Sequence, residues 1–461
     1  MSNYSVLDFG AVADGRTLDT AAVQKAVDAC AAAGGTVWFP KGTYVLSTVF
    51  LKSGVHIRFE DGTVVLGSLN FYDYAPQEAV DYPLYQDASH SYFHLAMFVG
   101  IDCDNISFGG RALVDMRSVW DEDGVRGAAI VHRGPKCISL KNCTCVEIAD
   151  LELKNVTDLA VYFAGCRDVE IHHLRMQVYI DGISPDNCER VRIHDCDVES
   201  GDDGIVFKSS YTLNRLGVCR DIRVWNCRVK SRCSAIKFGT ETNGGFEDIT
   251  VEDIDVFDTR ITAIAIESVD GAVLDGVTLR NIRIRNAGGI LYICLGDRMR
   301  GPSGRPIGAI RNLLLENITA DGPYEAYDVM PWNYFSFKAG DTRQEPWSFR
   351  PLPEGQSPWK ESDPWQQTSN VCGLPGHPLE NVTLRNVHLT VSGGVSAYET
   401  EVAEPTTPYP EIYNLGWILP AKGIFFRHIN GLTLENVTVR SIHADTRPDF
   451  VFEDVCDCKT E

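Results

Sequence analysis

The sequence predicts an all-β fold, a parallel β-helix, from a repeat of short apolar segments and from the period of that repeat. Segments of the form apolar–x–apolar, two residues, apolar–x–apolar recur along the chain and are rich in Val and Ile, which predicts short strands. Equivalent apolar positions are 23, 22, 31, 27 and 28 residues apart, at Val146, Val169, Val191, Ile222, Ile249 and Val277. This period predicts stacked β-helix coils, because one coil cannot bury its apolar face alone.

A short helix is predicted before the first coil, over residues 19–33. Val23, Val27 and Cys30 recur there at helical spacing, and Asp19 is the expected N-cap. Such a helix would cap the β-helix, because it covers an apolar cross-section that would otherwise face water.

The chain is expected to form one β-helix domain over residues 1–461, interrupted by one long insertion. The repeat spacing jumps to 69 residues between Leu313 and Val382, and the insertion, 324–372, holds four of the eight tryptophans. Loops of this length are usually functional or disordered, and the aromatic content argues against disorder. We expect the insertion to line a binding cleft; the alternative is a lid that contacts no ligand.

Composition excludes several classes of partner. The chain has 42 Lys+Arg and 63 Asp+Glu, a net charge of −21, which argues against nucleic-acid binding and against docking on an anionic membrane. No stretch of about 18 apolar residues predicts a transmembrane helix. The start of the chain lacks the pattern of a secretory signal, so we expect a cytoplasmic protein.

Cysteine usage predicts free thiols. The 15 cysteines include no CxxC pair, which argues against a structural zinc site, and without a signal sequence reduced thiols are expected. Five of them, each three residues before an aligned apolar position, predict a ladder of small buried side chains: Cys103, Cys143, Cys166, Cys188 and Cys219.

Three aspartates form the most informative pattern. Aligning Gly182 with Gly204 places Asp181 against Asp203 on the neighbouring coil, and Asp202 adds a third carboxylate beside them. Like charges this close disfavour simultaneous ionisation, which suits glycoside hydrolysis by one protonated and one ionised carboxyl group. The same acids would suit calcium, and a solvated surface turn is the structural alternative.

The chain resembles the polygalacturonase-like hydrolases known as glycoside hydrolase family 28. The stretch DFGAVADGRTLD from Asp8 looks like the opening common to pectin-active β-helix proteins. Asp181-Gly182 matches the end of the family's Asn-Thr-Asp-Gly motif, and Asp202-Asp203 matches its Asp-Asp pair. The resemblance implies a right-handed β-helix and an inverting hydrolysis, with Asp202 as general acid and with Asp181 and Asp203 activating water. We expect no metal and no cofactor.

Three positions depart from the family pattern. Ser234 stands where the family has its histidine, Ala265 where it has an arginine, and Glu267 where it has a lysine. An acid at the site of a galacturonate carboxylate would repel it. The stretches around Lys237 and Glu267 look like a bacterial subgroup of the family. Because Lys237 aligns with Ala265 one coil earlier, it is the expected partner of a hydroxyl or carboxylate.

The remaining candidates for substrate binding are one acid and two cations. Glu241, together with Glu267, is expected to bind sugar hydroxyls. Arg133 and Arg298 follow strand-like runs and are the best remaining cations for an acidic sugar, with surface salt bridges as the alternative. The sugar that is cleaved is therefore expected to be neutral, or to turn its carboxylate toward Lys237 or Arg298.

The predicted function is hydrolysis of plant cell-wall oligosaccharides derived from pectin, without nucleic-acid or membrane partners. Two alternatives stay open. A β-helix lyase or epimerase on uronate glycans would need calcium and a cationic base near Asp202. A non-catalytic glycan-binding solenoid would fit the missing family histidine. The sugar, the linkage, endo or exo action and the oligomeric state are open at this stage.

Overall fold

The computed structural model describes residues 2–85, 93–119, 133–322, 366–396, 398, 400–405, 410–416 and 418–461. Contacts divide the chain into two compact units. Unit 1 comprises the described residues of Met1–Gly201 and Tyr211–Arg215, and unit 2 those of Asp202–Ser210, Leu216–Met330 and Trp347–Glu461. The predicted insertion lies almost entirely outside the described residues.

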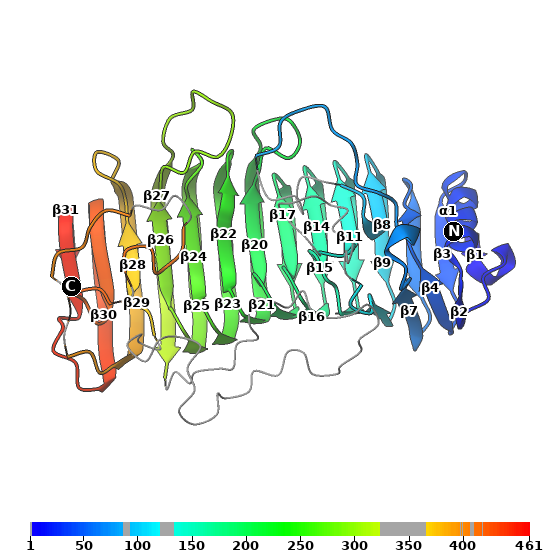
Figure 1. The fold of residues 1–461 in the computed structure, drawn as a ribbon. Helices are drawn as coiled ribbons and strands as arrows, with labels where there is room; N and C mark the ends of the chain where they lie inside the picture. The colour runs from blue at the N-terminus through cyan, green and yellow to red at the C-terminus, as the bar shows by residue number, and fades with distance from the viewer. Residues whose placement is uncertain are drawn as a thin grey trace. The chain divides into compact units, whose positions relative to one another are not determined.

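Near the start of unit 1 the helix α1 (Thr20–Ala31) packs against the first strands of the unit (Figure 1). Its buried side chains include Val23, Val27 and Cys30, the three residues whose spacing predicted the helix. Two short 3-10 turns, η1 (Val6–Phe9) and η2 (Phe71–Asp73), flank the early strands.

Asp19 does not cap α1 with its side chain. Its backbone is already in the helical region, at φ −88° and ψ −2°, whereas a capping side chain needs an extended residue. The carboxylate instead accepts hydrogen bonds from the backbone N–H groups of Val12, at 2.7 Å, and Ala13, at 3.1 Å. Asp19 therefore ties the preceding loop to the start of the helix.

The strands of unit 1 stack in three parallel ladders, one for each side of a coil. The first ladder contains β1 (Ser2–Ser5), β3 (Gly35–Phe39), β6 (Val55–Phe59), β9 (Asp104–Gly109), β12 (Thr144–Ala149), β15 (Arg167–His172) and β18 (Glu189–His194). The second contains β2 (Asp14–Leu18), β4 (Thr43–Leu46), β7 (Thr63–Gly67), β10 (Ala112–Asp115), β13 (Leu151–Lys154), β16 (Arg175–Val178) and β19 (Asp197–Ser200). The third contains β5 (Val49–Phe50), β8 (Ala96–Ile101), β11 (Lys136–Lys141), β14 (Val161–Ala164) and β17 (Ile183–Asp186).

The described strands of unit 2 form two parallel ladders, because its longer strands run through two sides of the coil. One ladder contains β20 (Ile205–Ser209), β22 (Ser234–Thr242), β24 (Thr262–Ser268), β26 (Leu291–Leu295), β28 (Ser369–Cys372), β30 (Ile424–His443) and β31 (Phe450–Thr460). The other contains β21 (Val218–Ser231), β23 (Gly245–Thr259), β25 (Val273–Ala287), β27 (Ala309–Asp321), β29 (Leu379–Gly393) and again β30.

The strand register confirms the predicted parallel β-helix. Val146 pairs with Val169, and Val169 with Val191, in unit 1. In unit 2 Ile222 pairs with Ile249, which in turn pairs with Val277. These side chains are buried and form the apolar column that stacked coils share.

Strand β28 corrects the end of the predicted insertion. Its residues Ser369–Cys372 were placed inside segment 324–372, but they pair with β26 on one side and β30 on the other. A four-residue strand is too short for its alternation to be recognised in the sequence.

The predicted cysteine ladder is present in unit 1. Cys143, Cys166 and Cys188 are fully buried, and Cys103 is nearly so. The backbone N–H of Cys143 donates to the Sγ atom of Cys166 at 3.3 Å. All fifteen cysteines of the chain carry free thiols. Within the part of the chain that is described, no helix has the length and hydropathy needed to cross a bilayer.

A ladder of asparagine side chains follows one corner of unit 2. Asn281, Asn317, Asn386 and Asn436 all have a φ between 52° and 56°. Each side-chain amide donates to the oxygen of the preceding member at 2.9 to 3.0 Å, and the first donates to Asp253. Asparagine tolerates this left-handed backbone better than most residues, so the corner selects it.

Replacing Asn317 by Ala is expected to lower the free energy of unfolding by about 2 to 3 kcal/mol, from two lost hydrogen bonds and left-handed strain. The Asn317→Gly variant loses the same hydrogen bonds without the strain, so its loss should be about 1 kcal/mol smaller. Denaturant unfolding of both variants measures the two effects. Equal losses would show that backbone strain contributes nothing at this corner.

Candidate functional site

The outward side of the β20–β22–β24 ladder carries a buried polar group in unit 2. Register pairs Val206 with Lys237, and Lys237 with Ala265, which confirms the alignment expected from the sequence. Glu267 lies two residues beyond Ala265 and so faces the same side of the sheet. On the other side Ile236 and Ile264 pair within the apolar column.

Asp202 and Asp203 lie just before β20, separated from it by Gly204. The Oδ1 atom of Asp203 accepts a hydrogen bond from the backbone N–H of Ser234 at 3.2 Å, and its Oδ2 atom lies 3.4 Å from Lys237 Nζ. Asp203 is only 4 % exposed, so its negative charge needs these partners. Asp202 is half-buried, and its backbone carbonyl accepts from the Ser231 hydroxyl at 2.5 Å.

Lys237 stands between two carboxyl groups. Its Nζ atom lies 3.4 Å from Asp203 Oδ2 and 3.9 Å from Glu267 Oε1. Burial disfavours the charged ammonium, but the attraction of Asp203 and Glu267 outweighs it and raises the pKa of Lys237 well above its ordinary value. Lys237 is therefore a fixed positive charge at neutral pH.

Glu267 is buried and holds a proton near neutral pH. Burial raises the pKa of its carboxyl from 4.5 to about 8, although Lys237 acts in the opposite direction. Its Oε2 atom has no hydrogen-bond partner among the described residues. A Cβ atom on Gly239, whose φ is +112°, would lie 3.0 Å from Oε2, so glycine leaves room for this carboxyl.

The raised pKa of Glu267 predicts a pH-dependent stability. Between pH 4.5 and about 8 the unfolded chain releases a proton that the folded chain keeps, so the free energy of unfolding falls as pH rises. Glu267→Gln cannot titrate and so lacks this pH dependence. As pH rises through that window, its free energy of unfolding should increase relative to that of the wild type by about 1.4 kcal/mol per pH unit. Urea unfolding at pH 5, 6, 7 and 8 measures the difference, and a flat difference would contradict the assignment.

A segment after β29 contributes residues that sequence reasoning missed. In 410–416, Glu411 is 9 % exposed, and burial and Asp202 raise the pKa of its carboxyl despite Lys237. Burial and Glu411 raise the pKa of Tyr413 to about 12. The segment has no recognisable motif and is distant in sequence, so only the folded chain shows that it reaches this site.

The same segment closes the position where the family has its arginine. Ile412 packs in one apolar cluster with Ala265, Tyr292 and Ile261. The backbone carbonyl of Ile412 also accepts a hydrogen bond from Asn370 Nδ2 at 3.0 Å. The outward face at Ala265 is therefore both uncharged and covered by apolar side chains.

A second polar network holds two further residues predicted from the sequence. Glu241 lies 3.4 Å from Lys208 and 2.7 Å from Arg300 through its two carboxylate oxygens. Arg298 donates to Asp270 from Nε at 2.9 Å and from Nη2 at 2.5 Å, and Nη2 also donates to the Thr240 carbonyl. A substrate carboxylate would have to compete with Asp270 for Arg298.

Two predicted residues belong to unit 1. Asp181 lies two residues before β17 and is 3 % exposed, and its carbonyl accepts from the Ala160 N–H at 2.9 Å. Arg133 lies 3.8 Å from Asp158, which also pairs with the buried Lys136 at 3.7 Å. The grouping of Asp181 with Asp202 and Asp203 stays a prediction.

The described residues contain one group of three side chains with metal-ligand spacing. Oxygens of Asp202 and Asp203 and the Cys233 thiol lie within 4.8 Å of one another. Burial and Asp203 raise the pKa of Cys233 well above its ordinary value, so the thiol is neutral and a poor ligand. Lys237 already supplies a positive charge to Asp203. We therefore do not assign a metal to this group.

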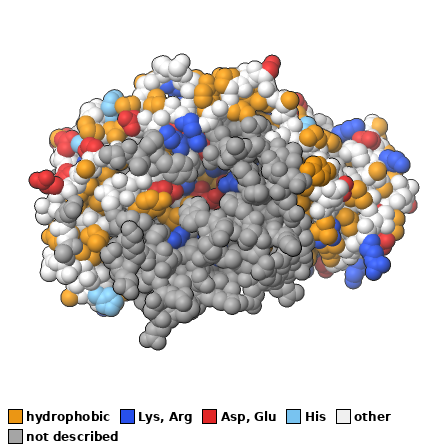
Figure 2. Space-filling view, in the orientation of Figure 1, with side chains coloured by type: hydrophobic (Ala, Val, Ile, Leu, Met, Phe, Trp, Pro, Cys, Tyr) orange, Lys and Arg blue, Asp and Glu red, His pale blue; other side chains and the backbone are white. Residues whose placement is uncertain are grey.

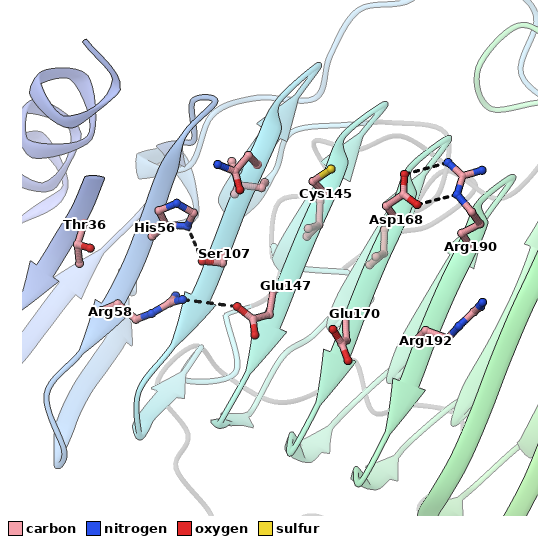
Figure 3. A pocket seen from close by; sticks show the side chains of 14 residues that line it. Thr36, His56, Arg58, Ser107, Cys145, Glu147, Asp168, Glu170, Arg190 and Arg192 are labelled. Carbon is pink, nitrogen blue, oxygen red and sulfur yellow. Dashed lines mark hydrogen bonds and ion pairs between the residues drawn. The ribbon is translucent and has the colours of Figure 1, made fainter. Parts of the chain in front are cut away.

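A groove in unit 1 is lined by residues other than those predicted for the functional site. About 640 Å³ in volume, it lies on the outward side of β6 to β18 (Figure 3). Its charged side chains pair with each other: Arg58 lies 3.5 Å from Glu147, and Arg190 lies 2.6 Å from Asp168. None of the residues predicted for the functional site lines this groove. Elsewhere, Figure 2 shows acidic and basic side chains close together near the middle of the visible face.

Comparisons with known proteins agree with the fold and with the opening of the chain. A family model described as "Rhamnogalacturonase A/epimerase, pectate lyase-like" matches residues 4–69. A probable polygalacturonase from Vitis vinifera is 26% identical over 267 residues, 54% of this chain and 54% of that protein. Over these stretches the chain is similar to a polygalacturonase and to a pectate lyase-like family model.

Solved structures extend the polygalacturonase-like fold over most of the chain. An exopolygalacturonase from Thermotoga maritima matches with a TM-score of 0.68 at 15% identity, over 95% of this chain and 92% of that one. A family 28 exopolygalacturonase from Yersinia enterocolitica matches with a TM-score of 0.65 at 19% identity, over 98% and 78%. At this identity the likeness concerns the fold alone. The chain spans about half the length of two curated relatives that it matches, the Vitis vinifera protein and an exo-poly-alpha-D-galacturonosidase from Dickeya chrysanthemi.

Proposed function

We propose that the chain is a glycoside hydrolase that cleaves pectin-derived oligosaccharides with inversion at the anomeric carbon. The observation that supports this most is the placement of Asp203, which is buried between the Lys237 ammonium, at 3.4 Å, and the Ser234 N–H, at 3.2 Å. A carboxylate held in this way is suited to accept a proton from water. Asp202 lies beside it and is more exposed.

In the proposed reaction Asp202 is the general acid and Asp203, with Asp181, is the base. The base takes a proton from water as the water oxygen bonds to the anomeric carbon. The bond from that carbon to the leaving oxygen breaks, and Asp202 gives its proton to this oxygen. Lys237 keeps Asp203 charged and oriented before water is activated.

Substrate charge follows from the residues around Lys237. The one fixed positive charge, Lys237, is already paired with Asp203 at 3.4 Å, and the position of the family arginine is an alanine under Ile412. A uronate carboxylate would therefore have to compete with Asp203 for Lys237. We therefore propose that the sugar cleaved at its anomeric carbon is neutral, such as rhamnose in a pectic oligosaccharide.

Defined oligosaccharides test the reaction and the substrate charge together. We expect rhamnose-containing pectic oligosaccharides to be cleaved with a kcat/KM at least about tenfold above that for unsubstituted galacturonan oligomers, because a penalty of about 1.4 kcal/mol for the uncompensated carboxylate already gives this factor. Proton NMR of the first product should show the inverted anomer.

Three results would contradict the proposal in different ways. A retained anomer would remove the inverting mechanism. This outcome is a direct test, because oxygens of Asp202 and Asp203 lie within 4.8 Å of each other, closer than the roughly 6.5–9.5 Å usual between the acid and base of inverting enzymes. An unsaturated product, seen by its absorbance, would identify a lyase. Better cleavage of plain galacturonan, with a KM that Lys237→Ala leaves unchanged, would remove the charge argument.

A further inference from the structure

A cavity of about 200 Å³ lies beside the polar site, on the outward side of β26 and β28 in unit 2. Tyr292, Cys294, Asn370 and Cys372 contribute to its floor. Register continues the row of Lys237 and Ala265 through Tyr292 to Asn370. Parallel strands lie about 4.8 Å apart, so Asn370 is about 14 Å along this face from Lys237.

Asn370 offers an unused hydrogen-bond acceptor in this cavity. The side chain is fully buried, and its Nδ2 atom donates to the backbone carbonyls of Thr368, at 3.4 Å, and Ile412, at 3.0 Å. Because both partners are carbonyl oxygens, which only accept, the amide atom that faces them is the nitrogen. The Oδ1 atom has no partner among the described residues, a state that costs about 1–3 kcal/mol when it is buried. A ligand with a hydroxyl group would satisfy it.

The charged residues at the cavity do not favour an acidic ligand. Arg427 is buried and donates to Glu453 at 2.6 and 2.8 Å, and to Glu404 and the Ala403 carbonyl at 3.3 Å each. Glu404 and Asp297 also line the cavity, which leaves more negative than positive charge there. A carboxylate would therefore find no available guanidinium.

The rest of the cavity wall is largely apolar, and the cavity is small. Leu295, Leu374 and Leu415 line the cavity with several prolines and Val269. A volume of about 200 Å³ lies below the 300–1,000 Å³ typical of drug-sized ligands, which suits a single ring. A sugar ring combines the two required features, because it has hydroxyl donors at its edge and apolar C–H faces.

We propose that this cavity binds one uncharged sugar residue of the substrate, with a hydroxyl group donating to Asn370 Oδ1. This inference rests on the proposed function and deepens it. The scissile bond would lie near Asp203 and Lys237, and the second neutral residue about three strands away. Ile412 covers Ala265 and Tyr292 between these positions, so the connecting part of the glycan would pass outside Ile412. Tyr292, which follows Ala265 in the row, lies between the two positions.

Binding of simple glycosides tests the cavity without turnover. The probes are methyl α-D-galactopyranoside, methyl α-L-rhamnopyranoside and methyl α-D-galactopyranosiduronate, titrated by NMR into the full chain. We expect at least one neutral glycoside to bind at least about tenfold more tightly than the uronate, with Asn370→Ala weakening that binding about tenfold. Leu374→Trp, in a surface turn that lines the cavity, should abolish it.

The matched control is Val273→Trp, which places the same side chain at a 38 % exposed position of β25, in the other ladder. It should bind the probes as the wild type does. Equal binding of neutral and uronate probes, or unchanged binding in Leu374→Trp, would overturn the proposal. If neutral probes bind as expected but no glycan is cleaved, the cavity stands and the hydrolase function fails. If glycans are cleaved and Leu374→Trp leaves KM and binding unchanged, only the cavity proposal fails.

Discussion

Replacing Asp202 by Asn is expected to lower kcat at least about 100-fold on the best oligosaccharide substrate, with little change in KM. The amide keeps the shape of the side chain but cannot give a proton to the leaving oxygen. Because Asp202 is half-buried and asparagine has the same shape, the folded state should keep most of its stability. Initial rates from reducing-sugar release, with thermal unfolding beside them, measure both expectations.

Asp253→Asn is the matched control for this variant. Asp253 is exposed on β23 and accepts from Asn281 Nδ2 at 3.0 Å, and the oxygen of an asparagine would accept the same bond. Its rate should stay within about twofold of the wild type, as for a surface change with little effect on the free energy of folding. Near-normal turnover of Asp202→Asn would exclude Asp202 as the general acid.

Replacing Lys237 by Met is expected to lower the free energy of unfolding by about 3–5 kcal/mol, the usual loss when one partner of a buried ion pair is removed. The ammonium is 3 % exposed and lies 3.4 Å from Asp203, which would stay buried with its charge uncompensated. Activity should fall at the same time, because Asp203 would lose the charge that orients it. Urea unfolding and steady-state rates report the two effects separately.

A double-mutant cycle separates stability from catalysis at this pair. Asp203→Asn removes the uncompensated charge, so adding it to Lys237→Met should restore much of the lost stability while activity stays low. Lys237→Arg keeps the charge and should be more stable than Lys237→Met. If the double variant is no more stable than Lys237→Met alone, the ion pair does not explain the loss.

The repeat could be predicted from the sequence because each coil has the same alternation of apolar and polar residues. Val146, Val169 and Val191 follow the apolar column, and the register of Lys237 with Ala265 follows from the same alignment. Strands with alternating side chains have only one register that buries every apolar residue. The alternation of apolar and polar residues therefore predicts which side chains face outward.

Contacts made by loops could not be predicted in this way. Ile412 reaches Ala265 from a segment more than one hundred residues later in the chain, and no repeat marks it. Arg298 looked like a cation for a substrate, but the sequence does not show that its guanidinium faces Asp270. Side-chain partners across loops depend on tertiary packing, which carries no periodic signal.

The asparagine ladder of unit 2 bears on how such a chain changes length in evolution. Asn281, Asn317 and Asn386 bond one another across successive strands, although 36 and 69 residues separate the partners in sequence. Deleting one residue inside a strand would shift every row of that coil, whereas residues added between strands leave the rows intact. Insertions should therefore accumulate in the loops between strands or come as whole coils, and related chains should differ there while keeping the asparagine of each coil.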